Sequence, residues 1–93
     1  MIEYLYNTIR ATVGDDMHIT AIITDDQQNL ITENCSFMIH DTNDKLISST
    51  LGVYQDEAWL FNIPTTGLEK GKYWYCICYG NQKLCFKQRL YLV

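Results

Sequence analysis

The chain has 93 residues, a formal net charge of −4 and 47% hydrophobic residues. This length accommodates a single domain, residues 1–93, and the hydrophobic content is too high for a disordered chain. The acidic balance argues against nucleic acid as the main partner, because phosphate binding requires clustered lysines and arginines. No apolar run approaches the roughly 18 residues that a membrane helix needs, so we expect no membrane partner either.

The first residues show neither the basic start nor the apolar stretch of a signal peptide. We therefore expect synthesis in a cytoplasm, where thiols stay reduced. The sequence has four cysteines: Cys35, Cys76, Cys78 and Cys85. The spacing of Cys76 and Cys78 is too short for the usual zinc knuckle, and we expect no metal.

Apolar and polar residues alternate with a period of two along most of the chain, which is typical of strands rather than helices. The pattern predicts strands at residues 4–10, 17–24, 35–40, 45–50 and 59–63, with polar turns at 14–16, 25–29 and 41–44. One helical turn near residues 65–68 is the best helical candidate. With the C-terminal hairpin this makes about seven strands, and their regular spacing predicts an all-β fold, an antiparallel sandwich or a partly closed barrel.

The C-terminal hairpin is the clearest predicted element. Alternation places Tyr73, Tyr75, Ile77 and Tyr79 on one face, and Trp74, Cys76 and Cys78 on the other. A turn at Gly80-Asn81 predicts four cross-strand pairs: Ile77 with Leu84, Tyr75 with Phe86, Trp74 with Lys87, and Cys76 with Cys85. The tyrosine side would face the core, and the reverse side would face outward. We expect the last strand, residues 90–93, at a sheet edge.

Charge is distributed unevenly along the chain. Residues 1–69 contain all eleven acids and two cations, whereas residues 70–93 contain five cations and no acid. The basic segment either packs beside acidic loops of the same molecule, or meets an acidic face on a neighbouring copy or a partner protein. On the second interpretation the reverse side of the hairpin is a protein interface, and its candidate residues are Trp74, Lys83, Lys87 and Arg89.

The sequence contains no arrangement of residues that indicates catalysis. His18 and His40 fall opposite the apolar positions of their strands, so we expect them at the surface. The paired acids lie in or beside turns, where they typically serve as turn formers. No base–nucleophile pair and no glycine-rich phosphate loop is present, and we expect neither an enzyme nor a cofactor.

Several short motifs resemble a known family. They are G-D-D-M-H-I at residues 14–19, D-D at 25–26, F-M-I at 37–39 and T-G-L-E-K-G-K-Y-W-Y at 66–75, followed by a glycine turn. Together they resemble small immunoglobulin-like β-sandwich modules of tailed-bacteriophage virions, closest in style to the N-terminal module of upper-baseplate proteins. The resemblance spans nearly the whole chain and implies no catalytic residues. No receptor-binding or fibre region follows in this sequence, which favours a free-standing accessory subunit.

From this resemblance we expect a non-enzymatic virion structural protein, made in the host cytoplasm. It would be an accessory or decoration subunit that binds capsid or tail proteins, and pairing with a neighbouring copy stays open. One alternative is a carbohydrate- or host-surface-binding module that uses Trp59 or Trp74. A second is a small cytoplasmic regulator that binds a cell protein.

Overall fold

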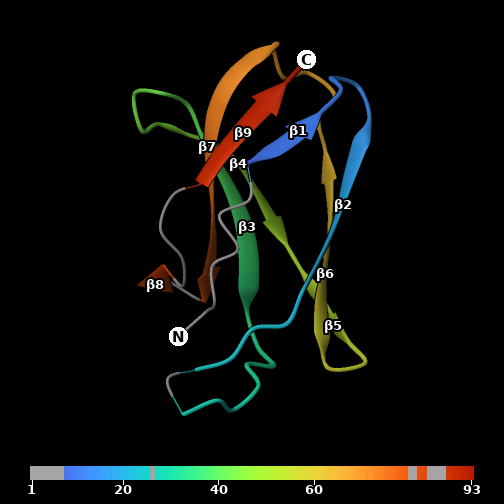
Figure 1. The fold of residues 1–93 in the computed structure, drawn as a ribbon, viewed down its shortest axis with the longest axis vertical. Coiled ribbons are helices and arrows are strands. Elements are labelled where there is room, and N and C mark those ends of the chain that lie inside the picture. Colours follow the sequence, from blue (N-terminus) through green and yellow to red (C-terminus); the bar gives the residue numbers. More distant parts are fainter. Residues whose placement is uncertain (1–7, 26, 80–81, 84–87) are drawn as a thin grey trace.

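The structure is a computed structural model that describes residues 8–25, 27–79, 82–83 and 88–93 (Figure 1). These residues form nine strands in two sheets, and no helix occurs among them. The first sheet, sheet A, has the order β1 (Ile9–Ala11), β9 (Gln88–Leu92), β7 (Gly71–Tyr79), β3 (Cys35–His40) and β4 (Leu46–Leu51), with β8 (Gln82–Lys83) paired to β7. The second, sheet B, has the order β2 (Asp16–Ala21), β6 (Ala58–Pro64) and β5 (Val53–Gln55).

The predicted all-β sandwich is therefore confirmed, with corrections to its strands. The strand β5 was not predicted because only Gly52 separates it from β4. The chain that follows the hairpin turn is described as two strands, β8 and β9. The expected helical turn at 65–68 is a tight turn in which the Leu68 N–H donates to the Thr65 carbonyl. Pairing is antiparallel except between β1 and β9, which run parallel.

The expectation that the last strand lies at a sheet edge is wrong. The β9 strand pairs with β7 on one side and with β1 on the other. Its residue Leu90 lies opposite both Tyr73 and Ile9, and it is fully buried. The parallel partner comes from the far end of the chain, so no local pattern in the sequence could indicate it.

The hairpin register is correct near its turn and shifts further away. Tyr79 pairs with Gln82 and Cys78 with Lys83, as the turn at Gly80-Asn81 requires. However, Tyr75 pairs with Gln88 rather than Phe86, and Trp74 pairs with Arg89 rather than Lys87. Between the Cys78–Lys83 and Tyr75–Gln88 pairs the returning chain has two more residues than β7, and because this number is even, Arg89 stays on its predicted face. The predicted pairs Ile77–Leu84 and Cys76–Cys85 lie outside the described residues.

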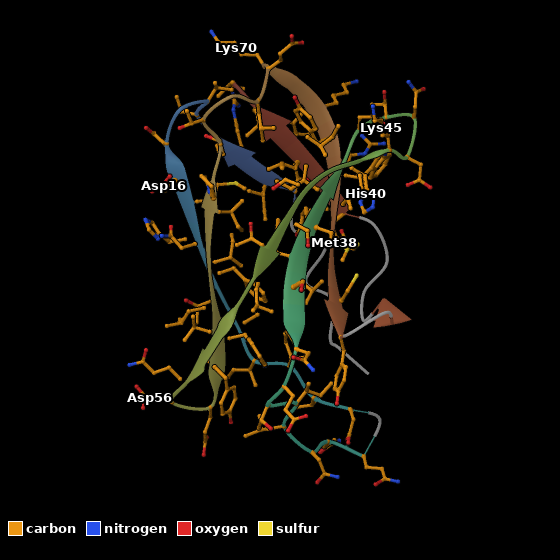
Figure 2. All side chains as sticks on the ribbon, turned by 180° about the vertical axis from the view of Figure 1, so that it is seen from behind. Asp16, Met38, His40, Lys45, Asp56 and Lys70 are labelled. Atoms are coloured by element: carbon orange, nitrogen blue, oxygen red, sulfur yellow. The ribbon has the colours of Figure 1, made fainter. Side chains whose placement is uncertain are left out.

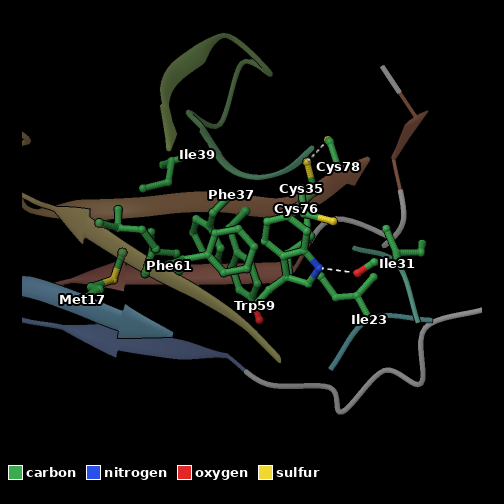
Figure 3. Packing of buried hydrophobic residues seen from close by; sticks show 14 of the residues in the cluster. Met17, Ile23, Ile31, Cys35, Phe37, Ile39, Trp59, Phe61, Cys76 and Cys78 are labelled. Atoms are coloured by element: carbon green, nitrogen blue, oxygen red, sulfur yellow. Dashed lines mark hydrogen bonds between the residues drawn. The ribbon is translucent and has the colours of Figure 1, made fainter. Parts of the chain in front are cut away.

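The core lies between the two sheets and is built around aromatic rings (Figure 3). The Phe37 ring of sheet A stacks on Tyr75 with 5.0 Å between ring centroids, and it meets Phe61 of sheet B at 5.9 Å. Trp59 continues this row, 6.3 Å from Phe61. The prediction that Tyr75 and Ile77 face the core is confirmed by their burial, whereas Tyr73 is half-buried. Leu84 and Phe86, expected beside them, lie outside the described residues.

Two connections carry the chain from sheet A to sheet B. Between β1 and β2, the buried Thr65 hydroxyl accepts a hydrogen bond from the Gly14 N–H at 2.9 Å and donates to the Asp15 carbonyl. Between β4 and β5, Gly52 packs directly against the rings of Trp59 and Phe61. Both connections therefore fix the position of one sheet against the other.

Candidate functional site

The two sheets differ in the charges that their strands carry. The described strands of sheet A contain Arg10, Lys72, Lys83 and Arg89 but no Asp or Glu. The described strands of sheet B contain one acid, Asp16, and neither Lys nor Arg. The other described acids lie in the connections between strands. The uneven distribution of charge along the sequence therefore gives sheet A described strands that contain no acidic residue.

The cations of sheet A gather on the face that points away from the core. Trp74 pairs with Arg89, while Tyr91 lies opposite Lys72 on one side and opposite Arg10 on the other. The side chains of Arg10, Lys72 and Arg89 are exposed, and those of Trp74 and Tyr91 are half-buried. We call these five residues the basic face. Their neighbours Leu90 and Leu92 on β9 are buried on the core side, as strand alternation requires.

Arg89 is held in position on the basic face by two neighbours. Its guanidinium lies over the Trp74 ring, 5.6 Å from the ring centroid. Its Nη1 also donates a hydrogen bond to the Tyr91 hydroxyl at 3.3 Å. A cation–π contact at an exposed site contributes about 0.5–1 kcal/mol, enough to bias the orientation of the side chain. The remaining guanidinium donors can then bind carboxylates of another molecule.

The structure brings together only part of the predicted interface. Trp74 and Arg89 are direct neighbours, but Lys83 lies on β8, opposite Cys78 and towards the other end of β7. The Lys83 side chain and the whole of Lys87 lie outside the described residues. Prediction missed three members of the basic face. Lys72 could have been found by extending the alternation of Trp74, whereas Arg10 and Tyr91 meet only through the parallel β1–β9 pair.

A second exposed surface, which prediction also missed, lies at the β4–β5 edge. Each of these strands is the last in the order of its sheet. Residues 46–55 contain no charged residue, and four of their large apolar side chains are exposed: Leu46, Ile47, Leu51 and Val53. Unpaired edges usually carry charges or prolines that prevent association. This edge is less protected than the β1 edge of sheet A, which carries Arg10.

The other candidate residues fall into structural roles, with one exception. Trp59 is only 3% exposed and its Nε1 donates to the Ile31 carbonyl at 2.6 Å, so it cannot serve as a sugar-stacking platform. The Asp25 and Asp41 carboxylates accept backbone N–H groups within their own turns. His18 is exposed as expected, but His40 is buried, and its Nδ1 has no hydrogen-bond partner. The expectation of a surface His40 is therefore wrong.

The part of the chain that the structure describes contains no group of three His, Cys, Asp or Glu side chains placed to hold a metal ion. It also contains no helix long and apolar enough to cross a membrane. Comparisons of the chain with protein-family models, with curated proteins and with solved structures find no match.

Proposed function

We propose that the protein is a non-enzymatic structural subunit of a phage particle, an accessory or decoration protein that binds an acidic surface of a capsid or tail protein through its basic face. The observation that carries the proposal is the clustering of three exposed cations and two aromatic side chains on acid-free strands. Trp, Tyr and Arg are the residues most enriched in the energetic centres of protein interfaces.

The geometry of the basic face suits recognition of a protein. Its side chains project from three adjacent strands, β1, β9 and β7, so their spacing is fixed before binding. Rigid placement reduces the entropy lost on association. The positive charge complements an acidic partner and accelerates docking. On a particle that repeats the same site many times, a modest interface is sufficient when a subunit makes several contacts at once.

The strand order supports the immunoglobulin-like part of the resemblance. In the constant-type order of that fold, the third, sixth and seventh strands form one sheet, which faces a sheet of the first, second, fourth and fifth strands. Here β3, β7 and β9 are neighbours and face a sheet of β2, β6 and β5, whereas the first strand, β1, pairs with β9 instead. This arrangement is what we expect if the module is built like those of tailed-phage virions.

The carbohydrate-binding alternative can no longer use Trp59, which is in the core. It would depend on Trp74, which is half-buried and has the Arg89 guanidinium over its ring. A cytoplasmic regulator would use the same basic face. The two protein-binding functions therefore differ in where the bound protein is found, in purified particles or in the host cytosol.

Reversing charge on the basic face tests the proposal. The double variant Lys72→Glu/Arg89→Glu should fold normally but reduce the occupancy of the protein in purified particles about 10-fold or more, because truncating buried interface charges commonly costs 2–5 kcal/mol. Occupancy is measured by quantitative mass spectrometry of particles grown with each variant, and folding by thermal unfolding.

The matched control is Lys45→Glu/Lys70→Glu, which makes the same change in net charge at two exposed lysines outside the strands of sheet A. It should leave occupancy close to that of the wild type. Normal occupancy of the Lys72/Arg89 variant would refute the contact surface. Absence of the wild-type protein from purified particles, with capture of a cytosolic partner through the same face, would instead favour the regulator.

A further inference from the structure

Three sulfur atoms meet on the outer side of sheet A, between β3 and β7. The Cys76 and Cys78 Sγ atoms are 3.7 Å apart, and the Cys78 Sγ lies 3.6 Å from the Met38 Sδ. Met38 pairs directly with Cys76 across the two strands. All three project opposite to Phe37 and Tyr75, the neighbouring residues that stack in the core. Figure 3 labels the two cysteines, and Figure 2 labels Met38 from the other side.

The distance between the two thiols shows that their side chains converge. Residues two apart on a strand are separated by roughly 6.5–7 Å along its axis, so sulfurs that stood straight out would be about that far apart. Two thiolates bound to one tetrahedral metal ion, at a metal–sulfur distance of about 2.3 Å, lie roughly 3.8 Å from each other. The observed 3.7 Å therefore matches the spacing of donors that share an ion.

The two thiols and the thioether determine which metal ion the cluster would bind. Thiolates are soft ligands that bind both monovalent copper and zinc, but a structural zinc site takes four ligands from cysteine, histidine or carboxylate, whereas Cu(I) also accepts a thioether; calcium sites use oxygen. The third donor here is a thioether, and no third His, Cys, Asp or Glu joins the two cysteines among the described residues. We propose that Cys76, Cys78 and Met38 form a three-sulfur binding site for Cu(I). On binding, the two thiols release their protons to solvent, and the copper keeps its oxidation state.

An independent feature of the same face also points to a ligand. His40 lies two residues from Met38 on β3, on the same side of the sheet, and it is only 8% exposed. Its buried Nδ1 has no hydrogen-bond partner, a state that normally costs about 1–3 kcal/mol unless something compensates. Imidazole nitrogen is a further copper ligand. Met38 is half-buried, whereas Cys76 and Cys78 are almost fully buried.

The test is a titration of the full, reduced chain with Cu(I) under anaerobic conditions, in competition with a coloured Cu(I) chelator. We expect one copper per chain, by elemental analysis of the dialysed complex, and a near-ultraviolet thiolate-to-copper absorption. Cys78→Ser should weaken Cu(I) binding by about 100-fold or more, since disturbing even the outer partners of a metal ligand costs 10–100-fold. Met38→Leu keeps the size and apolar character of the side chain, and should weaken binding about 10-fold without unfolding the protein.

The chain offers a matched control in Cys35. This thiol is buried at the start of β3, but it faces the core, on the opposite side of the sheet from the three sulfur atoms. Cys35→Ala should therefore leave the copper affinity unchanged. Wild-type affinity in Cys78→Ser, an equal loss in Cys35→Ala, or tighter binding of Zn²⁺ than of Cu(I) would each overturn the proposal. None of these results depends on the partner proposed for the basic face.

Discussion

Sheet A and sheet B bury the same core but present different surfaces. The described strands of sheet A carry four cations and no acid, while those of sheet B carry one acid and no Lys or Arg. The difference arises partly from the sequence, in which the last 24 residues contain no acid. It also depends on topology, because the parallel pairing of β1 with β9 adds Arg10 from the other end of the chain. A surface with one sign of charge has thus been assembled from two distant segments.

The largest expected effect tests whether the two sheets are stable only together. Phe61→Ala removes a fully buried ring of sheet B that contacts Phe37 of sheet A, and should lower the free energy of unfolding by about 3–5 kcal/mol. Circular dichroism and tryptophan fluorescence, which comes from Trp59 of sheet B and Trp74 of sheet A, should report one shared transition in denaturant. The neighbouring Leu60→Ala, at a partly exposed side chain, should cost under about 1 kcal/mol. Separate transitions for the two probes would show that the sheets unfold independently.

The next largest effect is a pH dependence of the free energy of unfolding, which arises from Cys35 on the core side of sheet A. Burial, and secondarily the charge of Cys78, raises the pKa of Cys35 from 9.0 to about 11. Because the folded-state pKa lies above the unfolded value, the neutral Cys35 thiol contributes to the free energy of unfolding below about pH 9. This contribution is lost as the pH rises towards 11. The loss corresponds to about 2–3 kcal/mol at 1.36 kcal/mol per pKa unit. Cys35→Ala should lose less stability over this pH range, measured by urea unfolding; an identical pH dependence would contradict the assignment.

A third substitution addresses the connection between the sheets at β4 and β5. A Cβ atom at Gly52 would lie 2.6 Å from the Phe61 Cε1 and 2.8 Å from the Trp59 Cε3, both in the rigid core. Gly52→Ala should therefore destabilise the protein by about 1–3 kcal/mol through overpacking. A control is Gly52→Ala combined with Phe61→Leu, which opens space for the methyl group. The two changes should cost less together than the sum of their separate costs, and simple additivity would argue against the contact.

The same comparison shows what could be predicted from the sequence. Alternation placed Tyr75 inside and Trp74 outside correctly, because the side-chain faces of a strand depend only on parity. Register away from the turn was wrong, since Tyr75 pairs with Gln88, and the two additional residues have no signature in the local pattern. The parallel β1–β9 pair and the buried His40 depend on contacts between distant segments. Two of the four candidate interface residues, Trp74 and Arg89, lie side by side because they share one hairpin.

The other connection between the sheets, from β1 to β2, depends on a hydrogen bond rather than on packing. Thr65→Val keeps the shape of a fully buried side chain, but leaves the Gly14 N–H without its acceptor and the Asp15 carbonyl without the hydroxyl donor. We expect a loss of about 1–2 kcal/mol. Thr65→Ser retains the hydroxyl and should retain most of the stability. Equal losses in the two variants would show that the methyl group, not the hydroxyl, matters here.

The smallest expected effect is a gain, at the tip of sheet B. Asp56 and Glu57 join β5 to β6 in a two-residue turn, and both have positive φ angles, 53° and 66°. Such turns favour Asn-Gly or Asp-Gly, because a residue other than glycine is strained in this conformation. Glu57→Gly should therefore raise the free energy of unfolding by about 0.5–1 kcal/mol, a few degrees in melting temperature. Glu57→Ala removes the same charge without relieving the backbone, so an equal gain in both variants would assign the effect to charge and not to conformation.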